Sequence, residues 1–138
     1  MPSLYTLEVV TPERVMLSEP VTFTIAPGSE GELGILAGHA PLMSALNPGE
    51  VRATLADGRT TAHIVISGGF MEVTPSRTTI LAEAAERADE IDVTRAEADL
   101  AAARQMLSEA GSGTAQADQA RNAVAHAETR VRAGRQNR

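Results

Sequence analysis

Three residues in a glycine-rich stretch of this chain have the side chains best suited to chemistry. Glu30 and Glu32 lie two residues apart among closely spaced glycines, and His39 stands between Gly38 and Pro41. Two carboxylates can act as general acid and base in glycoside hydrolysis, and a histidine can act as a base near neutral pH. A hydrolase that uses Glu30, Glu32 and His39 is therefore one hypothesis.

The surroundings of these residues favour a different interpretation. A glycine-rich turn is exposed, and it lacks the buried setting in which a pair of carboxylates takes up separate acid and base roles. The chain has no cysteine and no lysine, which excludes thiolate and Schiff-base nucleophiles and a P-loop lysine. Its three histidines are scattered, so no metal site is expected. We expect no catalytic residues, and we interpret Glu30 and Glu32 as a solvated turn or an acidic handle for a basic partner.

Length and charge limit the class of protein further. With 138 residues, the chain fits one domain or one small domain with an appendage. A net charge of −6 argues against nucleic acid as a partner. Residues 1–8 lack the features of a signal peptide, and no window approaches the apolar length that crosses a bilayer. We expect a cytoplasmic protein that reaches a membrane only through another protein.

Up to about Ala84 the pattern is typical of strands. Apolar residues alternate over residues 21–25 and 51–55, which is the period of a half-buried strand. Further strands are expected at residues 4–10, 60–67, 70–74 and 78–81, with turns at Asp57-Gly58 and Pro75-Ser76. Many short strands separated by such turns predict an antiparallel β-sandwich or a flattened barrel. We expect the sandwich, with about ten short strands.

From about Ile91 the period becomes helical. Two apolar seams with spacings of three and four residues flank a short glycine loop; they comprise Val93, Ala96, Leu100, Ala103 and Leu107, then Ala117, Ala120, Val124, Ala127 and Val131. We expect N-caps at Asp92 and Thr114 and helix ends at Gly111 and Gly134. The prediction is an α+β chain, with a β-sandwich over residues 1–86 and an antiparallel two-helix hairpin over residues 87–138.

Half of the seam positions are alanine, and each buried alanine methyl contributes only about 0.8 kcal/mol. The hairpin is thus either weakly held and able to move or an ordinary fixed appendage.

Five arginines fall within residues 121–138, more than are needed to complement one helix dipole. This excess favours an acidic partner. Asp92 and Arg95 have two possible roles. They can be an N-cap and an exposed residue of the first helical turn, or, three residues apart, they can contact a polar ligand from one face of the helix.

Several segments resemble the epsilon subunit of F-type ATP synthases. The match is nearly residue by residue over SEGELGI at residues 29–35, GHAPL at residues 38–42 and Pro48-Gly49. It continues in LEVVTP at residues 7–12, SGGFMEV at residues 67–73 and LAEAA at residues 81–85. The resemblance covers nearly all of residues 4–132 and is less specific after Leu100.

This resemblance implies a non-catalytic central-stalk subunit that couples the gamma shaft to the membrane-embedded c-ring during proton-driven ATP synthesis. The complex would sit on the cytoplasmic face of the bacterial inner membrane, with this chain as a peripheral component. The residues implied in docking on gamma and the c-ring are Glu30, Gly31, Glu32, His39, Ala40, Pro41 and Leu42. Exposed carboxylates there would pair with a basic loop.

The resemblance also implies that the hairpin can extend along gamma toward the catalytic head and inhibit ATP hydrolysis. Its basic residues would then lie near an acidic segment of the beta subunits. The alpha subunits are further implied partners. The arginines implied in this contact with the head are Arg121, Arg130, Arg132 and Arg135.

Some relatives bind ATP between sandwich and hairpin, which defines an alternative role as an ATP-sensing module. The residues that match their site are Glu86, Ile91, Asp92, Arg95 and Arg132. Ala102 and Glu128 fall where those relatives carry arginine, which removes charge-assisted bonds to phosphate. We therefore expect weak ATP binding at most and no other cofactor.

Overall fold

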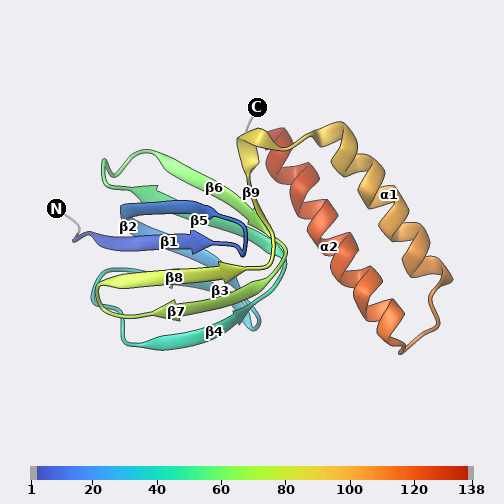
Figure 1. The fold of residues 1–138 in the computed structure, drawn as a ribbon, viewed down its shortest axis with the longest axis horizontal. Coiled ribbons are helices and arrows are strands. Elements are labelled where there is room, and N and C mark those ends of the chain that lie inside the picture. Colours follow the sequence, from blue (N-terminus) through green and yellow to red (C-terminus); the bar gives the residue numbers. More distant parts are fainter. Residues whose placement is uncertain (1–2, 137–138) are drawn as a thin grey trace. The chain divides into compact units, whose positions relative to one another are not determined.

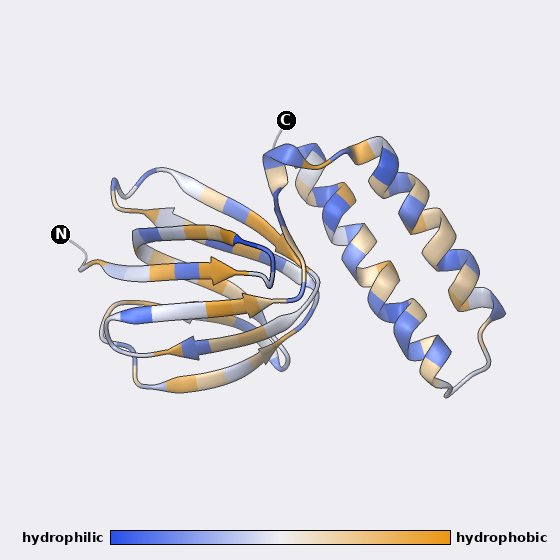
Figure 2. Ribbon diagram, in the orientation of Figure 1, coloured by the Kyte–Doolittle hydropathy of each residue, from blue (hydrophilic) through white to orange (hydrophobic). Residues whose placement is uncertain are grey.

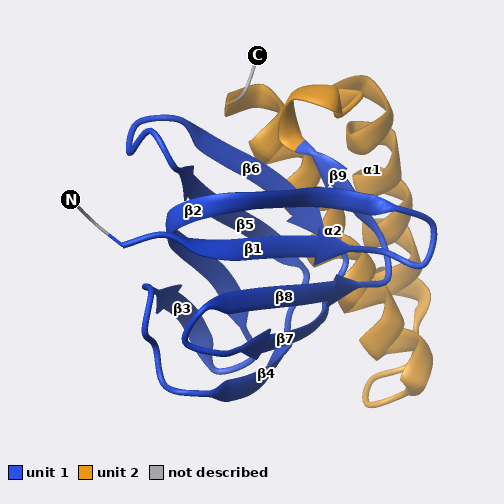
Figure 3. Ribbon diagram, turned by 60° about the vertical axis from the view of Figure 1, so that its left-hand side comes forward, with its two compact units in different colours: residues 1–87 blue, residues 88–138 orange. Residues whose placement is uncertain are grey.

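A computed structural model describes residues 3–136, which contain nine strands and two α-helices (Figure 1). The strands are β1 (Tyr5–Val10), β2 (Val15–Gly28), β3 (Gly31–Ile35), β4 (Leu42–Leu46), β5 (Gly49–Leu55), β6 (Thr61–Ile66), β7 (Gly69–Val73), β8 (Arg77–Ala82) and β9 (Ala85–Arg87). A 3₁₀ turn at Ala88–Glu90 precedes α1 (Val93–Glu109) and α2 (Ala115–Gln136). The chain divides after Arg87 into two compact units (Figure 3), which are described separately.

The first unit is one sheet folded over onto itself. Its strand order is β1-β8-β7-β4-β2-β5-β6-β9, with β3 paired to β2 and a further pairing between β1 and β2. The β1–β8 pair is parallel, whereas the other pairings in the described chain are antiparallel. This arrangement confirms the predicted α+β class with an N-terminal sandwich, built from nine strands where about ten were expected.

The fourteen-residue strand β2 joins the two layers. Its first half pairs with β1, where Thr6 lies opposite Pro20, and its second half pairs with β5 and β3. The register with β5 shifts between Val21 and Phe23. A proline at an edge position and a bulge both bend a strand, so β2 passes from one layer to the other at this point.

The interior of the sandwich is filled by alternate residues of the strands. The largest fully buried side chains include Leu7, Ile35, Ile64, Met71 and Ile80. Figure 2 shows orange, hydrophobic segments along the strands, whereas the helices carry many blue, hydrophilic segments between pale ones. The sandwich therefore has an aliphatic core.

Tyr5 is the one aromatic residue of this core, and its hydroxyl has two polar neighbours. The oxygen lies 2.7 Å from Thr24 Oγ1 and 2.8 Å from the carbonyl oxygen of Ile35. Burial raises the pKa of the Tyr5 hydroxyl, and the hydrogen bond with Thr24 opposes that shift. The hydroxyl thus joins β1, β2 and β3 inside the core.

Residues 28–49 contain more regular structure than their glycines and prolines suggested. β3 and β4 both fall inside this stretch, separated by a bent segment at residues 36–41. The two hairpin turns are as expected: Asp57 Oδ1 accepts from the backbone N–H groups of Arg59 and Thr60, and Thr74 and Arg77 exchange backbone hydrogen bonds.

The second unit is the expected antiparallel hairpin. Asp92 caps α1 by accepting from the backbone N–H of Arg95 at 3.1 Å, and Thr114 Oγ1 accepts from Ala117 N–H at the start of α2. All ten predicted seam residues are buried or half-buried. The first helix ends at Glu109, with Ala110 as its C-cap and Gly111 directly after it.

The predicted helix end at Gly134 is wrong, because α2 continues through it to Gln136. A Cβ atom on Gly134 would lie 2.7 Å from Val93 Cγ2 and 3.1 Å from Ile91 Cγ2. This glycine therefore provides space for the start of α1 and does not end the helix.

Gly134→Ala should destabilise the hairpin, although alanine is favoured over glycine in an exposed helix by about 1 kcal/mol. Val93 is β-branched and stiff, so the new methyl forces the helices apart. Urea unfolding of the full chain, followed by helical circular dichroism, measures the effect. Val93→Ala in the same chain removes the clashing methyl and should recover stability relative to Gly134→Ala alone. A stabilising Gly134→Ala would contradict this account of the contact.

Candidate functional site

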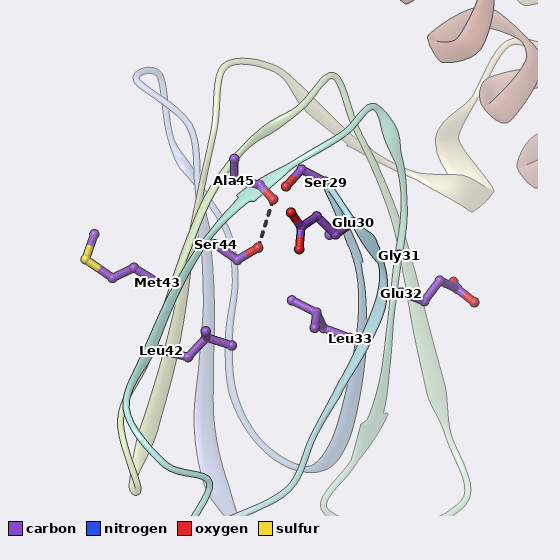
Figure 4. Close-up of a pocket in the computed structure, with 10 residues that line it drawn as sticks. Ser29, Glu30, Gly31, Glu32, Leu33, Leu42, Met43, Ser44 and Ala45 are labelled. Carbon is purple, nitrogen blue, oxygen red and sulfur yellow. Dashed lines mark hydrogen bonds between the residues drawn. The ribbon is translucent and has the colours of Figure 1, made fainter.

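The turn between β2 and β3 carries the two glutamates on opposite sides. Figure 4 shows the Glu30 side chain directed into a groove, while Glu32 points away from it. Glu32 Oε2 accepts from Arg52 Nη2 at 2.8 Å. Glu30 is exposed and makes no hydrogen bond or ion pair with the residues that the structure describes. Of the two carboxylates, Glu30 is thus the one available to a partner.

The groove itself lies between β3 and β4, which diverge from each other. β4 meets β2 only where Gly28 lies opposite Leu46, and β3 pairs with β2 alone. The space between them, about 490 Å³, is lined by residues 28–33 and 42–45. Leu33 and Leu42 point toward each other across it and pack against the core (Figure 4). Leu42, an expected docking residue, is therefore mainly a wall of this groove.

His39 lies far from the glutamates. β3 leads away from the Glu30 turn, and its five residues span about 13 Å at the usual rise of a strand. Beyond it, His39 Nδ1 lies 2.7 Å from the carbonyl oxygen of Ala40, and Gly38 N–H donates to Pro75 at the β7–β8 turn. The seven expected docking residues thus divide into two groups at opposite ends of β3 and β4.

This separation removes the basis for the hydrolase hypothesis. The three side chains do not converge, because Glu32 is paired with Arg52 on one side, Glu30 enters the groove, and His39 lies at the other end of β3. In the described residues, no group of three or more histidines, cysteines or acids is placed to hold a metal ion.

A row of exposed apolar side chains, which the sequence reasoning missed, crosses the outer face at the Glu30 end. Phe70 on β7 lies opposite Ala45 on one side and Leu81 on the other, and Leu81 lies beside Val10 of β1. Phe70 is 60% exposed and Leu81 56%. We call Ala45, Phe70 and Leu81, together with the half-buried Val10, the apolar row. Met43, two residues before Ala45, is 73% exposed and extends it.

The apolar row is joined to the Glu30 turn. Ser29 N–H donates to the carbonyl oxygen of Ala45 at 3.0 Å, so the turn and the end of the row are held together. Large exposed apolar patches on soluble domains mark surfaces for partners. An apolar strip with an unpaired carboxylate at its end has the composition of a protein-binding surface with a polar rim.

The residues matched to an ATP site are distributed over both units. Glu86 lies on β9, opposite Val65 of β6. In the hairpin unit Ile91 is buried, Asp92 caps α1, and Arg95 is exposed in the first turn. Arg132 lines a shallow groove on the hairpin together with Leu100, Arg104, Glu128, Val131, Arg135 and Gln136. Glu128 therefore places a carboxylate beside Arg132.

The arginines expected to contact the catalytic head do not form one basic tip. Arg121 lies near the loop end of α2 and pairs with Asp118 on its own helix. Arg130 and Arg135 lie at the other end of the hairpin, where each pairs with an acid of α1. The antiparallel fold returns the end of α2 to the start of α1, so most of the basic charge meets acidic charge inside the unit. Arg132 has no ion pair with the described residues.

Comparison with known proteins decides the family. The family model described as the β-sandwich domain of the ATP synthase delta/epsilon chain matches residues 4–88. The ATP synthase epsilon chain of Pelotomaculum thermopropionicum is 56% identical over 92 residues, which are 67% of each chain. The chain belongs to the ATP synthase epsilon chain family.

Other relatives extend the similarity into the hairpin. The epsilon chain of Desulforamulus reducens is 51% identical over 106 residues, 77% of this chain and 79% of the relative. That of Brucella canis is 45% identical over 112 residues, 81% and 82% of the two chains. The similarity to these relatives therefore covers the sandwich and at least part of the first helix.

Solved structures agree with this assignment. A chain in the cryo-EM structure of the Euglena gracilis mitochondrial ATP synthase, with OSCP, F1 and c-ring, gives a TM-score of 0.80 at 28% identity, covering 94% of this chain and 80% of that chain. A chain of the Tetrahymena thermophila central stalk and c-ring shares the fold, with a TM-score of 0.65 at 15% identity, covering 96% and 98%. Neither helix among the described residues is long and apolar enough to cross a membrane.

Proposed function

We propose that this chain is a non-catalytic rotor subunit that couples the gamma shaft of ATP synthase to its c-ring. The observation that carries the proposal is the apolar row with Glu30 at its end. The exposed row supports a broad contact with the shaft, since apolar burial drives most protein association. The unpaired carboxylate supports pairing with a basic loop of the ring, which adds specificity.

The groove between β3 and β4 supports the same role. Its rim carries Glu30 and Ser44, while Leu33 and Leu42 form its wall. Glu32 contributes indirectly, because its ion pair with Arg52 ties β3 to β5 and holds the turn in place. Through these contacts the chain is a peripheral part of a complex on the cytoplasmic face of a bacterial plasma membrane, and it drives no reaction of its own.

The hairpin supports a second, regulatory part of the proposal. Its seam is rich in alanine, so less apolar surface holds it together than in the sandwich. Elements that move in regulation are drawn from such weakly packed parts of a protein. We propose that it changes position to inhibit ATP hydrolysis, meeting the beta and alpha subunits with its arginines.

An ATP-sensing role is the weaker alternative. Glu128 lies in the groove beside Arg132 and pairs with Arg104 at 3.8 Å. A carboxylate at that place repels a phosphate group. The Asp92 side chain also serves as the helix cap. We therefore infer that ATP binds weakly.

Reconstitution tests the rotor role. Phe70→Asp and Leu81→Asp should each weaken binding of the chain to an ATP synthase depleted of its epsilon chain by about a hundredfold, since a charge in the centre of an apolar contact is left desolvated. Both side chains are exposed, so the thermal unfolding temperature of the free chain should hardly change. Leu4→Asp is the matched control, because Leu4 is similarly exposed and lies just before β1, at the opposite end of that strand from Val10. Unchanged binding of both row variants would reject the proposal.

Truncation tests the regulatory role. The same depleted complex should hydrolyse ATP more slowly with the full chain than with a chain that ends at Glu90. The truncated chain keeps the entire sandwich and should therefore still bind. Equal hydrolysis rates with the two chains would refute an inhibitory hairpin and leave the coupling role intact.

Calorimetric titration of the full chain tests the alternative. ATP should bind with a dissociation constant of about a millimolar or weaker. Glu128→Arg replaces the repelling carboxylate by a phosphate donor and should tighten binding by about tenfold or more. Micromolar binding by the unaltered chain would establish the ATP-sensing role in place of the inferred weak affinity.

A further inference from the structure

Three ion pairs join the two helices of the hairpin. They are Glu97–Arg135 at 3.2 Å, Asp99–Arg130 at 3.0 Å and Arg104–Glu128 at 3.8 Å. In each pair one partner belongs to α1 and the other to α2. We call these six residues the ionic ladder. Its Arg130 side chain is only 14% exposed, so that guanidinium is the least available to an outside partner.

The ladder begins at the open end of the hairpin, where α1 starts and α2 ends, and reaches Arg104 in the second half of α1. The open end also contains Gly134, which admits Ile91 and Val93 at close range. Charge pairing and tight packing thus coincide at this open end of the hairpin.

The loop end is held differently. There Gln105 donates to Glu109 on the same helix, and Arg121 pairs with Asp118 on the same helix. In the described residues no ion pair crosses between the helices at this end. The hairpin is therefore cross-linked by charge at one end only.

We infer that the ionic ladder is an electrostatic latch that withholds Arg130 and Arg135 of α2 from an acidic partner surface. This inference rests on the proposed regulatory role of the hairpin. Asp99 and Glu97 neutralise much of the charge of Arg130 and Arg135 and hold their side chains against α1, which makes both arginines poorer partners for the carboxylates of another chain. The acids of α1 are thus internal competitors of the partner, and they set how readily the hairpin gives up its closed form.

The size of the effect follows from the exposure of the pairs. An exposed ion pair shifts an equilibrium by a factor of about 1.5 to 5. Three such pairs acting together shift it by about threefold to a hundredfold. Salt screens exposed charges, so the latch weakens as ionic strength rises. A latch of this strength holds the hairpin closed in the free chain and yields to a partner of high negative charge.

Hydrogen exchange of the full chain tests the latch. Glu97→Gln with Asp99→Asn should speed amide exchange at residues 93–104 and 128–136 by about tenfold. Raising salt from about 0.05 to 0.5 M should speed exchange in the unaltered chain and change the variant little. Glu109→Gln with Asp118→Asn is the matched control, because it removes the same charge from acids that pair within their own helices.

A charge swap distinguishes loss of the ion pair from a general loss of helix stability as the cause of faster exchange. Glu97→Arg with Arg135→Glu rebuilds one pair in the opposite sense and should keep exchange at the level of the unaltered chain. The inference fails if the Glu97→Gln and Asp99→Asn variant exchanges no faster than the unaltered chain. It fails equally if the control variant speeds exchange to the same extent.

ATP hydrolysis by the reconstituted complex tests the consequence for regulation. The chain with Glu97→Gln and Asp99→Asn should inhibit hydrolysis more strongly than the unaltered chain. In this variant Arg130 and Arg135 have lost their acidic partners on α1. Faster exchange without stronger inhibition would reject the competition with a partner. If truncation at Glu90 leaves hydrolysis unchanged, the proposed regulatory function fails, while the exchange experiment still decides whether the latch exists.

Discussion

The pairing of β2 with four other strands is the constraint on which the rest of the sandwich depends. β2 pairs with β1 along its first half and with β5, β3 and the end of β4 along its second. The bend near Pro20 and the bulge before Phe23 let one strand serve both layers. Because β2 ends at Gly28, the same strand also delivers the turn that carries Glu30. The position of the candidate docking group is therefore a consequence of how the sheet closes.

The strands and helices were predictable where a single period dominates the sequence. Alternation over residues 51–55 predicted β5, and the spacing of seam residues predicted both helices and their caps. β3 and β4 were not recognised, because glycines and Pro41 within residues 28–49 signal turns more strongly than the short apolar runs signal strands. The prediction of a helix end at Gly134 was wrong for a related reason. A glycine near the end of a chain is typical of a helix stop, whereas here it is required by contact with Val93.

The candidate site was predictable only in part. Glu30 stands out by type, but the direction of a side chain at a turn depends on the register of β3, which is why Glu32 could not be distinguished from it. The apolar row left one trace in the sequence: Phe70 and Met71 are adjacent and both apolar, so their side chains lie on opposite faces of β7. The ionic ladder could also have been predicted from the sequence. Matching the two seams around the glycine loop brings Glu97 toward Arg135 and Arg104 toward Glu128.

The two units owe their stability to different interactions, and this difference suits different roles. The sandwich buries large aliphatic side chains such as Leu7, Ile66 and Met71 completely, so it can present the apolar row on a surface that hardly deforms. The hairpin relies on alanine contacts and exposed ion pairs, each of which contributes little. Exposed ion pairs respond to charge and salt far more than a packed core does. A negatively charged molecule can therefore act on the hairpin without disturbing the apolar row.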